Sequence, residues 1–208
     1  MKTSFDTFTG WSAILAGISG FLYSVSFIVL QSDLLSALFL MLGGLFSTAA
    51  LTGLYQRLCE TESGFALLGL LLTLSAALGS ALHGGYDLAN ALHPSASPNT
   101  DLPNPIDPRG LLTFGVMGLG LFLFSWLITQ DRALPRGLAY LGYLSTLLML
   151  ILYLGRLIIL QATSLAIVIP ALLEGFIVNP LWYVWLGLTL LRSQSSSTRN
   201  VPMSILRN

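Results

Sequence analysis

Long runs of apolar residues alternate with short polar breaks along the whole chain. Six of these runs reach the length of about 20 residues that an α-helix needs to cross the hydrocarbon core of a bilayer. They cover residues 10–30, 34–56, 64–91, 110–130, 135–160 and 164–191. The pattern therefore predicts an all-α polytopic membrane protein, a bundle of six transmembrane helices that forms one domain over residues 1–192.

The breaks between the apolar runs are short, with one exception. Four of them hold only a few polar residues, at 31–33, 57–63, 130–132 and 161–163. The exception is the stretch 93–109, which contains five of the nine prolines and is expected to form the largest loop, on the outer side. Pro135 follows the fourth run, and because proline suits the first turn of a helix, the fifth helix is expected to begin there.

Basic residues fall mostly on one side of the predicted membrane. That side carries Lys2, Arg57, Arg132, Arg136, Arg192, Arg199 and Arg207, whereas the other has only Arg109, beside Asp33, Asp101 and Asp107. Cytoplasmic loops are enriched in Lys and Arg, so both termini are expected in the cytoplasm. Residues 193–208 would then be a polar cytoplasmic tail of a multi-pass protein of the cell membrane. Tryptophan prefers membrane interfaces, and the four tryptophans are expected at or near the cytoplasmic one: Trp11, Trp126, Trp182 and Trp185.

The composition supports a membrane protein. The chain of 208 residues is 54% hydrophobic and 9% charged, with a mean hydropathy of +0.79. Soluble proteins carry about 25% charged residues, so the lipid bilayer is the expected partner of this surface. A formal net charge of zero argues against nucleic acid as a partner. Asp6 lies where a signal peptide would be basic, so the first run is interpreted as a retained span.

Two of the predicted helices begin alike. A shift of 73 residues places "GFALLGLLLTL" (64–74) on "GLAYLGYLSTL" (137–147), with seven identical positions of eleven. Duplication of a helical hairpin, which some transporters show, and chance similarity within an apolar alphabet are both left open.

Polar side chains line one face of the third predicted helix near its outer end. Ser80, His83, Asp87 and Asn90 are spaced i, i+3, i+7 and i+10, which keeps them on one face, and Tyr86 is adjacent. One interpretation is a helix end that becomes solvated before the proline-rich loop. The other is a site in which Asp87 orients His83 to bind a proton, a metal or a polar head group.

The sixth predicted helix contains an acid near mid-bilayer. Glu174 lies about ten residues into the span, and ionisable residues at that depth usually face a cavity or a partner. Pro170 and Pro180 each remove a backbone donor, and Gly175 and Asn179 loosen the same segment. The helix is therefore expected to be kinked or partly broken around Glu174, as at many transporter binding sites.

Arg156, near the outer end of the fifth predicted helix, is the candidate partner of Glu174. The two helices join through a tight turn, so an ion pair Arg156–Glu174 is expected, either as a lock of the bundle or as part of a ligand or ion site. A snorkelling Arg156 is the alternative. Tyr153 on the fifth helix and Asn179 on the sixth complete the candidate cavity residues.

The sequence contains no motif for binding haem, zinc or a nucleotide, and none for a catalytic nucleophile. Both histidines, His83 and His93, belong to one helix and its outer end, which does not suit a haem with two axial histidines. Zinc needs three or four ligands; His83, Asp87, His93 and Glu174 could supply them only on paper, so no residue is assigned to a metal. The sequence contains no P-loop, dinucleotide fingerprint or nucleophile elbow, and neither a cofactor nor a catalytic residue is identified.

The end of the last run, "NPLWYVWLGLTLLR" (179–192), resembles the final helix of small uncharacterised bacterial integral-membrane proteins. These end in a proline, an aromatic cluster and a glycine before a basic stop. The resemblance covers one helix and implies a bacterial inner-membrane protein, without an activity to transfer.

Three functions are compatible with these patterns. The first is an integral membrane protein, such as a transporter, whose outward-side polar cavity binds a small molecule or ion through the candidate residues above. The second is a non-catalytic accessory subunit that associates with other membrane proteins or with itself. The third is an intramembrane metal-dependent hydrolase.

Overall fold

The structure is a computed structural model that describes residues 4–94, 112–131, 133–159, 161 and 163–197. Every regular element in these ranges is helical, and six helices are long and apolar enough to cross a membrane. This confirms the prediction of an all-helical, six-helix chain. Apart from His93 and Pro94, the loop expected at 93–109 lies outside the described residues, as does the tail beyond Ser197.

Three of the six helices contain a five-residue π-helical turn. The first is α1 (Ser4–Ser24) continued by η1 (Val25–Val29), and the fourth is η2 (Leu112–Val116) continued by α5 (Met117–Gln130). The sixth is α7 (Leu165–Leu173), η3 (Glu174–Val178) and α8 (Asn179–Ser197) in succession. The other three are α2 (Asp33–Leu58), α3 (Ser63–Leu92) and α6 (Arg136–Ile158).

Local sequence explains several helix boundaries. Ser32 is the N-cap of α2, and its side chain accepts a hydrogen bond from the Leu35 N–H, which satisfies one of the free donors of the first turn. Pro135 is the N-cap of α6, next to the position predicted for it. The first helix begins at Ser4 rather than near residue 10, with Asp6 in its first turn, where the helix dipole favours an acid.

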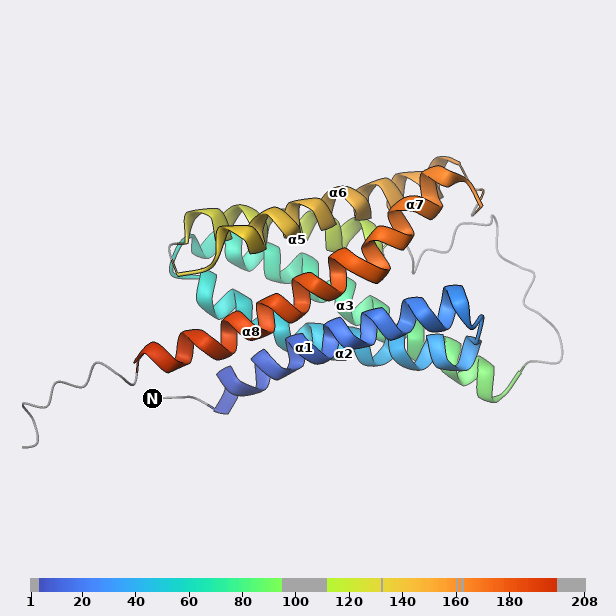
Figure 1. The fold of residues 1–208 in the computed structure, drawn as a ribbon, viewed down its shortest axis with the longest axis horizontal. Coiled ribbons are helices and arrows are strands. Elements are labelled where there is room, and N and C mark those ends of the chain that lie inside the picture. The colour runs from blue at the N-terminus through green and yellow to red at the C-terminus, as the bar shows by residue number, and fades with distance from the viewer. Residues whose placement is uncertain (1–3, 95–111, 132, 160, 162, 198–208) are drawn as a thin grey trace, which may run out of the picture.

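The helices run lengthwise beside one another, and α1 begins at the same end of the bundle at which α8 finishes (Figure 1). We call this the terminal end, and the opposite end, where α3 finishes and α7 begins, the loop end. Neighbouring helices pack in the order α8, α1, α2, α3, α5 and α6. The last span also touches α6, which brings the two ends of this series together.

Close approach of the helices depends on glycine. A Cβ atom at Gly44 of α2 would meet the backbone of Ala77 and Ala81 of α3, and one at Gly84 of α3 would meet the backbone of Ala37 and Met41. Small residues of this kind let transmembrane helices pack backbone to backbone.

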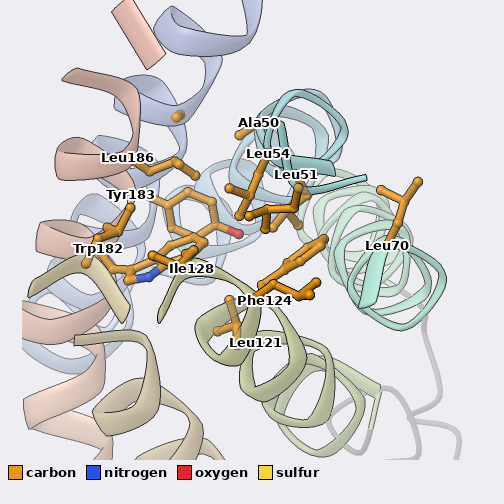
Figure 2. Close-up of a cluster of buried hydrophobic side chains, with 14 of the residues drawn as sticks. Ala50, Leu51, Leu54, Leu70, Leu121, Phe124, Ile128, Trp182, Tyr183 and Leu186 are labelled. Carbon is orange, nitrogen blue, oxygen red and sulfur yellow. The ribbon is translucent and has the colours of Figure 1, made fainter. Parts of the chain in front are cut away.

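The apolar core fills mainly the half of the bundle near the terminal end. Figure 2 shows Leu51 and Leu54 of α2 facing Phe124 of α5, with Trp182 and Tyr183 of α8 beside them. The sequence had suggested that Trp182 lies at or near a membrane interface. Instead, Trp182 is 1% exposed and belongs to this core. Many large apolar side chains on the outer faces are exposed, which suits a lipid environment.

The last span crosses the bundle diagonally. Its first part, α7, packs against α6 at the loop end, and its second part, α8, packs against α1 toward the terminal end (Figure 1). The change of neighbour falls at η3, which contacts both α6 and α1. The polar segment around Glu174 therefore lies where the span leaves one helix for another.

Candidate functional site

Glu174 is buried inside the bundle. It is 4% exposed, and its Oε1 accepts a hydrogen bond of 2.6 Å from the Ser145 hydroxyl of α6. Its Oε2 is buried as well and has no hydrogen-bond partner among the described residues. Half of the hydrogen-bonding capacity of a buried carboxyl group is thus left unused, and buried polar groups in proteins are seldom left so.

The backbone around Glu174 is a π-turn rather than a break. The N–H of Asn179 donates to the carbonyl of Glu174 five residues earlier, which defines the wider turn. Pro180 follows directly and has no N–H to offer the preceding turn. The span therefore stays helical through Glu174, so the partial break that the sequence suggested does not occur, and the wider turn lies just before Pro180. Single π-turns of this kind are frequent at functional sites.

The residue after Glu174 faces a different helix. A Cβ atom at Gly175 would collide with the Ser24 hydroxyl of α1, so glycine is needed for α1 to approach. The side-chain oxygen of Asn179 lies beside Gly20 of the same helix. The amide of Asn179 is also near the Glu174 carboxylate, without completing a hydrogen bond to Oε2.

Four more buried polar atoms lack a hydrogen-bond partner in the described part of the chain: Ser125 Oγ, Thr146 Oγ1, Trp182 Nε1 and Tyr183 OH. They come from α5, α6 and α8. Ser125 Oγ and Trp182 Nε1 both lie against Gly142 of α6, where a Cβ atom would touch them. Ser47 of α2 is near the Tyr183 hydroxyl, although the two do not form a hydrogen bond.

These atoms form, with Glu174 and Ser145, what we call the buried polar cluster: Ser47, Ser125, Gly142, Ser145, Thr146, Glu174, Trp182 and Tyr183. Gly142 and Ser145 are one turn apart on α6, and Thr146 is adjacent. Tyr183 interacts electrostatically with Glu174, and its ring packs edge-to-face against that of Trp182 at a centroid distance of 5.0 Å. The cluster therefore extends from the middle of the bundle toward the terminal end.

The expected ion pair between Arg156 and Glu174 does not form within the described residues, where the carboxylate is hydrogen-bonded to Ser145 instead. Ser145 and Arg156 are eleven residues apart on α6, or about 16 Å along the axis. Gly155 lies against Ile167 of α7, so Arg156 is level with the first turn of α7. Its side chain is exposed, as the snorkelling alternative expects.

The polar face of α3 is present at the loop end. His83 Nε2 and Asp87 Oδ2 are 3.0 Å apart, with 17% and 38% of the side chains exposed. Ser80 is buried, and its hydroxyl pairs with Thr113 of η2 at 3.3 Å. Tyr86 is exposed, as is Asn90.

A second group of loop-end residues faces α3 from the neighbouring helices. Tyr153 of α6 packs its ring against Gly115 of η2. Arg156 and Asp87 act electrostatically on Tyr23 of α1, which places charges of α6 and α3 around a tyrosine of α1. The structure thus separates the candidates into two sets. Glu174 and Asn179 lie at mid-bundle, whereas the residues on α3 and α6 gather at the loop end.

The described residues contain no group of three His, Cys, Asp or Glu side chains able to hold a metal ion. In particular, His83 and Asp87 at the loop end are not joined by Glu174. The described residues therefore provide no set of metal ligands that would support the hypothesis of a metal-dependent hydrolase.

The chain matches no family model, no curated protein and no solved structure. Its class follows from the fold alone: an all-helical chain with six candidate membrane-spanning helices. The site has to be interpreted from its own chemistry.

Sequence reasoning missed most of the buried polar cluster. Ser125, Ser145 and Thr146 are ordinary residues in apolar helices, and nothing in their spacing distinguishes them from serines that bond their own backbone, such as Ser75. The usable signal was the pair Trp182-Tyr183, which begins two residues after Pro180, since buried indole and phenol groups normally require a polar partner.

Proposed function

We propose that this protein is a small transporter of the cell membrane that binds a small molecule or ion inside its helix bundle at Glu174. The observation that carries the proposal is the buried carboxyl group with one oxygen bonded to Ser145 and the other without a partner. Ionisable residues at membrane depth are costly and commonly mark substrate or ion pathways. A purely structural acid would be expected to have both oxygens satisfied.

The surroundings of Glu174 support binding rather than simple packing. A π-turn places it where the last span changes neighbours, and the unpartnered Ser125 hydroxyl and Trp182 indole lie at Gly142, one turn from its hydrogen-bond partner Ser145. Irregular helices at membrane depth lie at the binding sites of many transporters. The charged groups around Tyr23 at the loop end would then receive the solute before it reaches Glu174.

The proposed orientation has the terminal end in the cytoplasm and the loop end outside, in an inner membrane of bacterial type. Arg57 and Arg136 lie at helix ends at the terminal end, and Arg192 lies in the part of α8 that approaches the same end. Excess basic residues mark the cytoplasmic side. The solute would enter from the outer side, where His83 and Asp87 lie.

Native mass spectrometry of the protein, extracted gently from its own membrane, tests the proposal. A protomer or homo-oligomer with an added small mass that Glu174→Gln loses would support binding at this site. Glu60→Gln is the matched control, because Glu60 is exposed in the turn between α2 and α3 and should leave the added mass unchanged. A discrete complex with other proteins and no small mass would instead identify an accessory subunit, with the Ser145–Glu174 contact as a lock.

A further inference from the structure

We infer that the ion bound by Glu174 is a proton, and that it reaches the carboxyl group from the terminal end through the buried polar cluster. The inference rests on the proposed function and deepens it by naming the ion and its path. It follows from three features of the structure: the lack of a cationic partner, the donor character of the nearby groups, and the one-sided distribution of unpartnered polar atoms.

The carboxyl group has no counter-charge. In the described residues, Glu174 forms no ion pair with Arg, Lys or His, although it is buried. The elements packed against η3 supply no positive group near it. On α6 it meets Ser145, on α1 its neighbour Gly175 meets Ser24, α7 contains no ionisable residue, and the titratable group that faces it from α8 is Tyr183. A carboxylate buried without a counter-charge is costly, and binding a proton removes the charge.

The nearby groups suit a proton better than a metal cation. Hard cations are surrounded by several oxygen ligands that all present lone pairs. Here Ser145 donates its hydrogen to the carboxylate, and the indole of Trp182 is a donor that cannot accept. The hydroxyl groups of Ser125, Thr146 and Tyr183 can both donate and accept, which is the property that proton transfer along a chain requires.

Three of the four other unpartnered groups lie on the terminal side of Glu174, and the fourth, Thr146, is adjacent to Ser145 on α6. Trp182 and Tyr183 follow it along α8, and Ser125 lies at Gly142, one turn from Ser145 toward the terminal end. On the other side, the buried positions of α6 beyond Thr146 carry no polar side chain: Leu148, Met149, Leu152 and Gly155. Buried waters typically bridge polar groups that otherwise lack partners, so hydroxyls and water together would form a path toward the terminal end.

Gly142 is the narrow point of this path. A Cβ atom there would occupy the space between Ser125 Oγ and Trp182 Nε1. Gly142→Ala should therefore obstruct proton movement without touching Glu174. Gly64→Ala is the matched control, because nothing lies within 4 Å of a Cβ atom at Gly64.

Infrared difference spectroscopy of the full chain in lipid nanodiscs tests both parts of the inference. At neutral pH we expect the C=O stretch of a protonated carboxylic acid that Glu174→Gln abolishes and Glu60→Gln retains. Ser145→Ala should move this band to higher frequency, since the C=O group loses its hydrogen-bond donor. After transfer to D₂O, the band should exchange more slowly in Gly142→Ala than in the wild type or in Gly64→Ala.

Four outcomes would overturn the inference. The acid band could be missing, or it could persist in Glu174→Gln. A carboxylate band at Glu174 that responds to NaCl but not to choline chloride would assign a metal cation. Unchanged exchange in Gly142→Ala would overturn the path.

The proposed function can be judged separately. A solute retained in native mass spectra and lost in Glu174→Gln, without an acid band, would leave the binding site and refute the proton. An acid band without any retained solute would leave the proton and refute solute binding. Each variant is accepted only if it retains the unfolding temperature of a folded protein, and Glu174→Asp provides a second titratable variant if Glu174→Gln fails to fold.

Discussion

The hydroxyl of Ser145 donates a 2.6 Å hydrogen bond to Oε1 of Glu174, which joins the fifth and last spans at the middle of the bundle. The bond lies at the point where the last span turns from α6 to α1. It is the only hydrogen bond between the side chains of α6 and the last span that the described residues show.

Ser145→Ala should destabilise the protein. The substitution leaves both carboxyl oxygens of Glu174 buried without a donor, and an unsatisfied buried group costs about 1–3 kcal/mol. Unfolding in detergent followed by circular dichroism would measure the loss. Ser75→Ala is the control, since that hydroxyl is exposed and bonds only to its own helix, at the Leu71 carbonyl. Equal stability of the two variants would contradict the role given to Ser145.

Gly84→Ala should push α2 and α3 apart. A Cβ atom at Gly84 would collide with the backbone of Ala37 and Met41, which cannot move aside as a side chain can. Overpacking of this kind costs about 1–3 kcal/mol. Gly64→Ala on the same helix meets nothing within 4 Å and should be neutral or stabilising, because alanine favours helix. Thermal unfolding of the two variants measures the difference, and a stable Gly84→Ala would contradict the close packing.

The helix content was predictable from the sequence because apolar run length decides whether a segment can span a bilayer. The interior of the bundle was not. Lipid-facing and buried positions are both apolar, so Trp182 could not be distinguished from an interfacial tryptophan by hydropathy. Its burial depends on α8 crossing toward α1, a tertiary feature that no local pattern contains.

The site was predicted in part. Glu174 stands out in any reading because an acid at membrane depth is rare. The prediction that Arg156 is its partner was wrong, because the packing of the two antiparallel helices determines which residues lie at the same depth. Gly155 lies against Ile167, and a step of about seven residues inward along the last span matches an equal step back along α6. That step leads to the turn containing Ser145, far from Arg156.

The similar segments 64–74 and 137–147 have a packing explanation. Gly69 of α3 faces Phe124 of α5, and Gly142, its equivalent in α6, faces Ser125 of the same helix. Both glycines thus accommodate α5, which is packed between α3 and α6. A shared packing partner accounts for the matching glycines whether or not a hairpin was duplicated.

Arg156→Gln should leave stability unchanged within about 0.5 kcal/mol, because the side chain is exposed and does not meet Glu174. A double-mutant cycle with Glu174→Gln should give a coupling energy near zero. Removing one partner of a buried ion pair would instead cost about 3–5 kcal/mol. A coupling of that size would show that the two residues pair in the membrane after all.

Cysteine labelling should show the terminal end inside the cell. Cys59 is the only cysteine and lies after α2 at the terminal end, whereas Asp33 is exposed at the opposite end of the same helix. In intact cells, a membrane-impermeant maleimide should label Asp33→Cys in a Cys59→Ser background and leave the wild-type Cys59 unlabelled until the membrane is permeabilised. Because Cys59 is half-buried, Glu60→Cys in the same background provides an exposed probe of the terminal end. Labelling of Glu60→Cys but not of Asp33→Cys in intact cells would reverse the orientation, and with it the direction from which solute and proton reach Glu174.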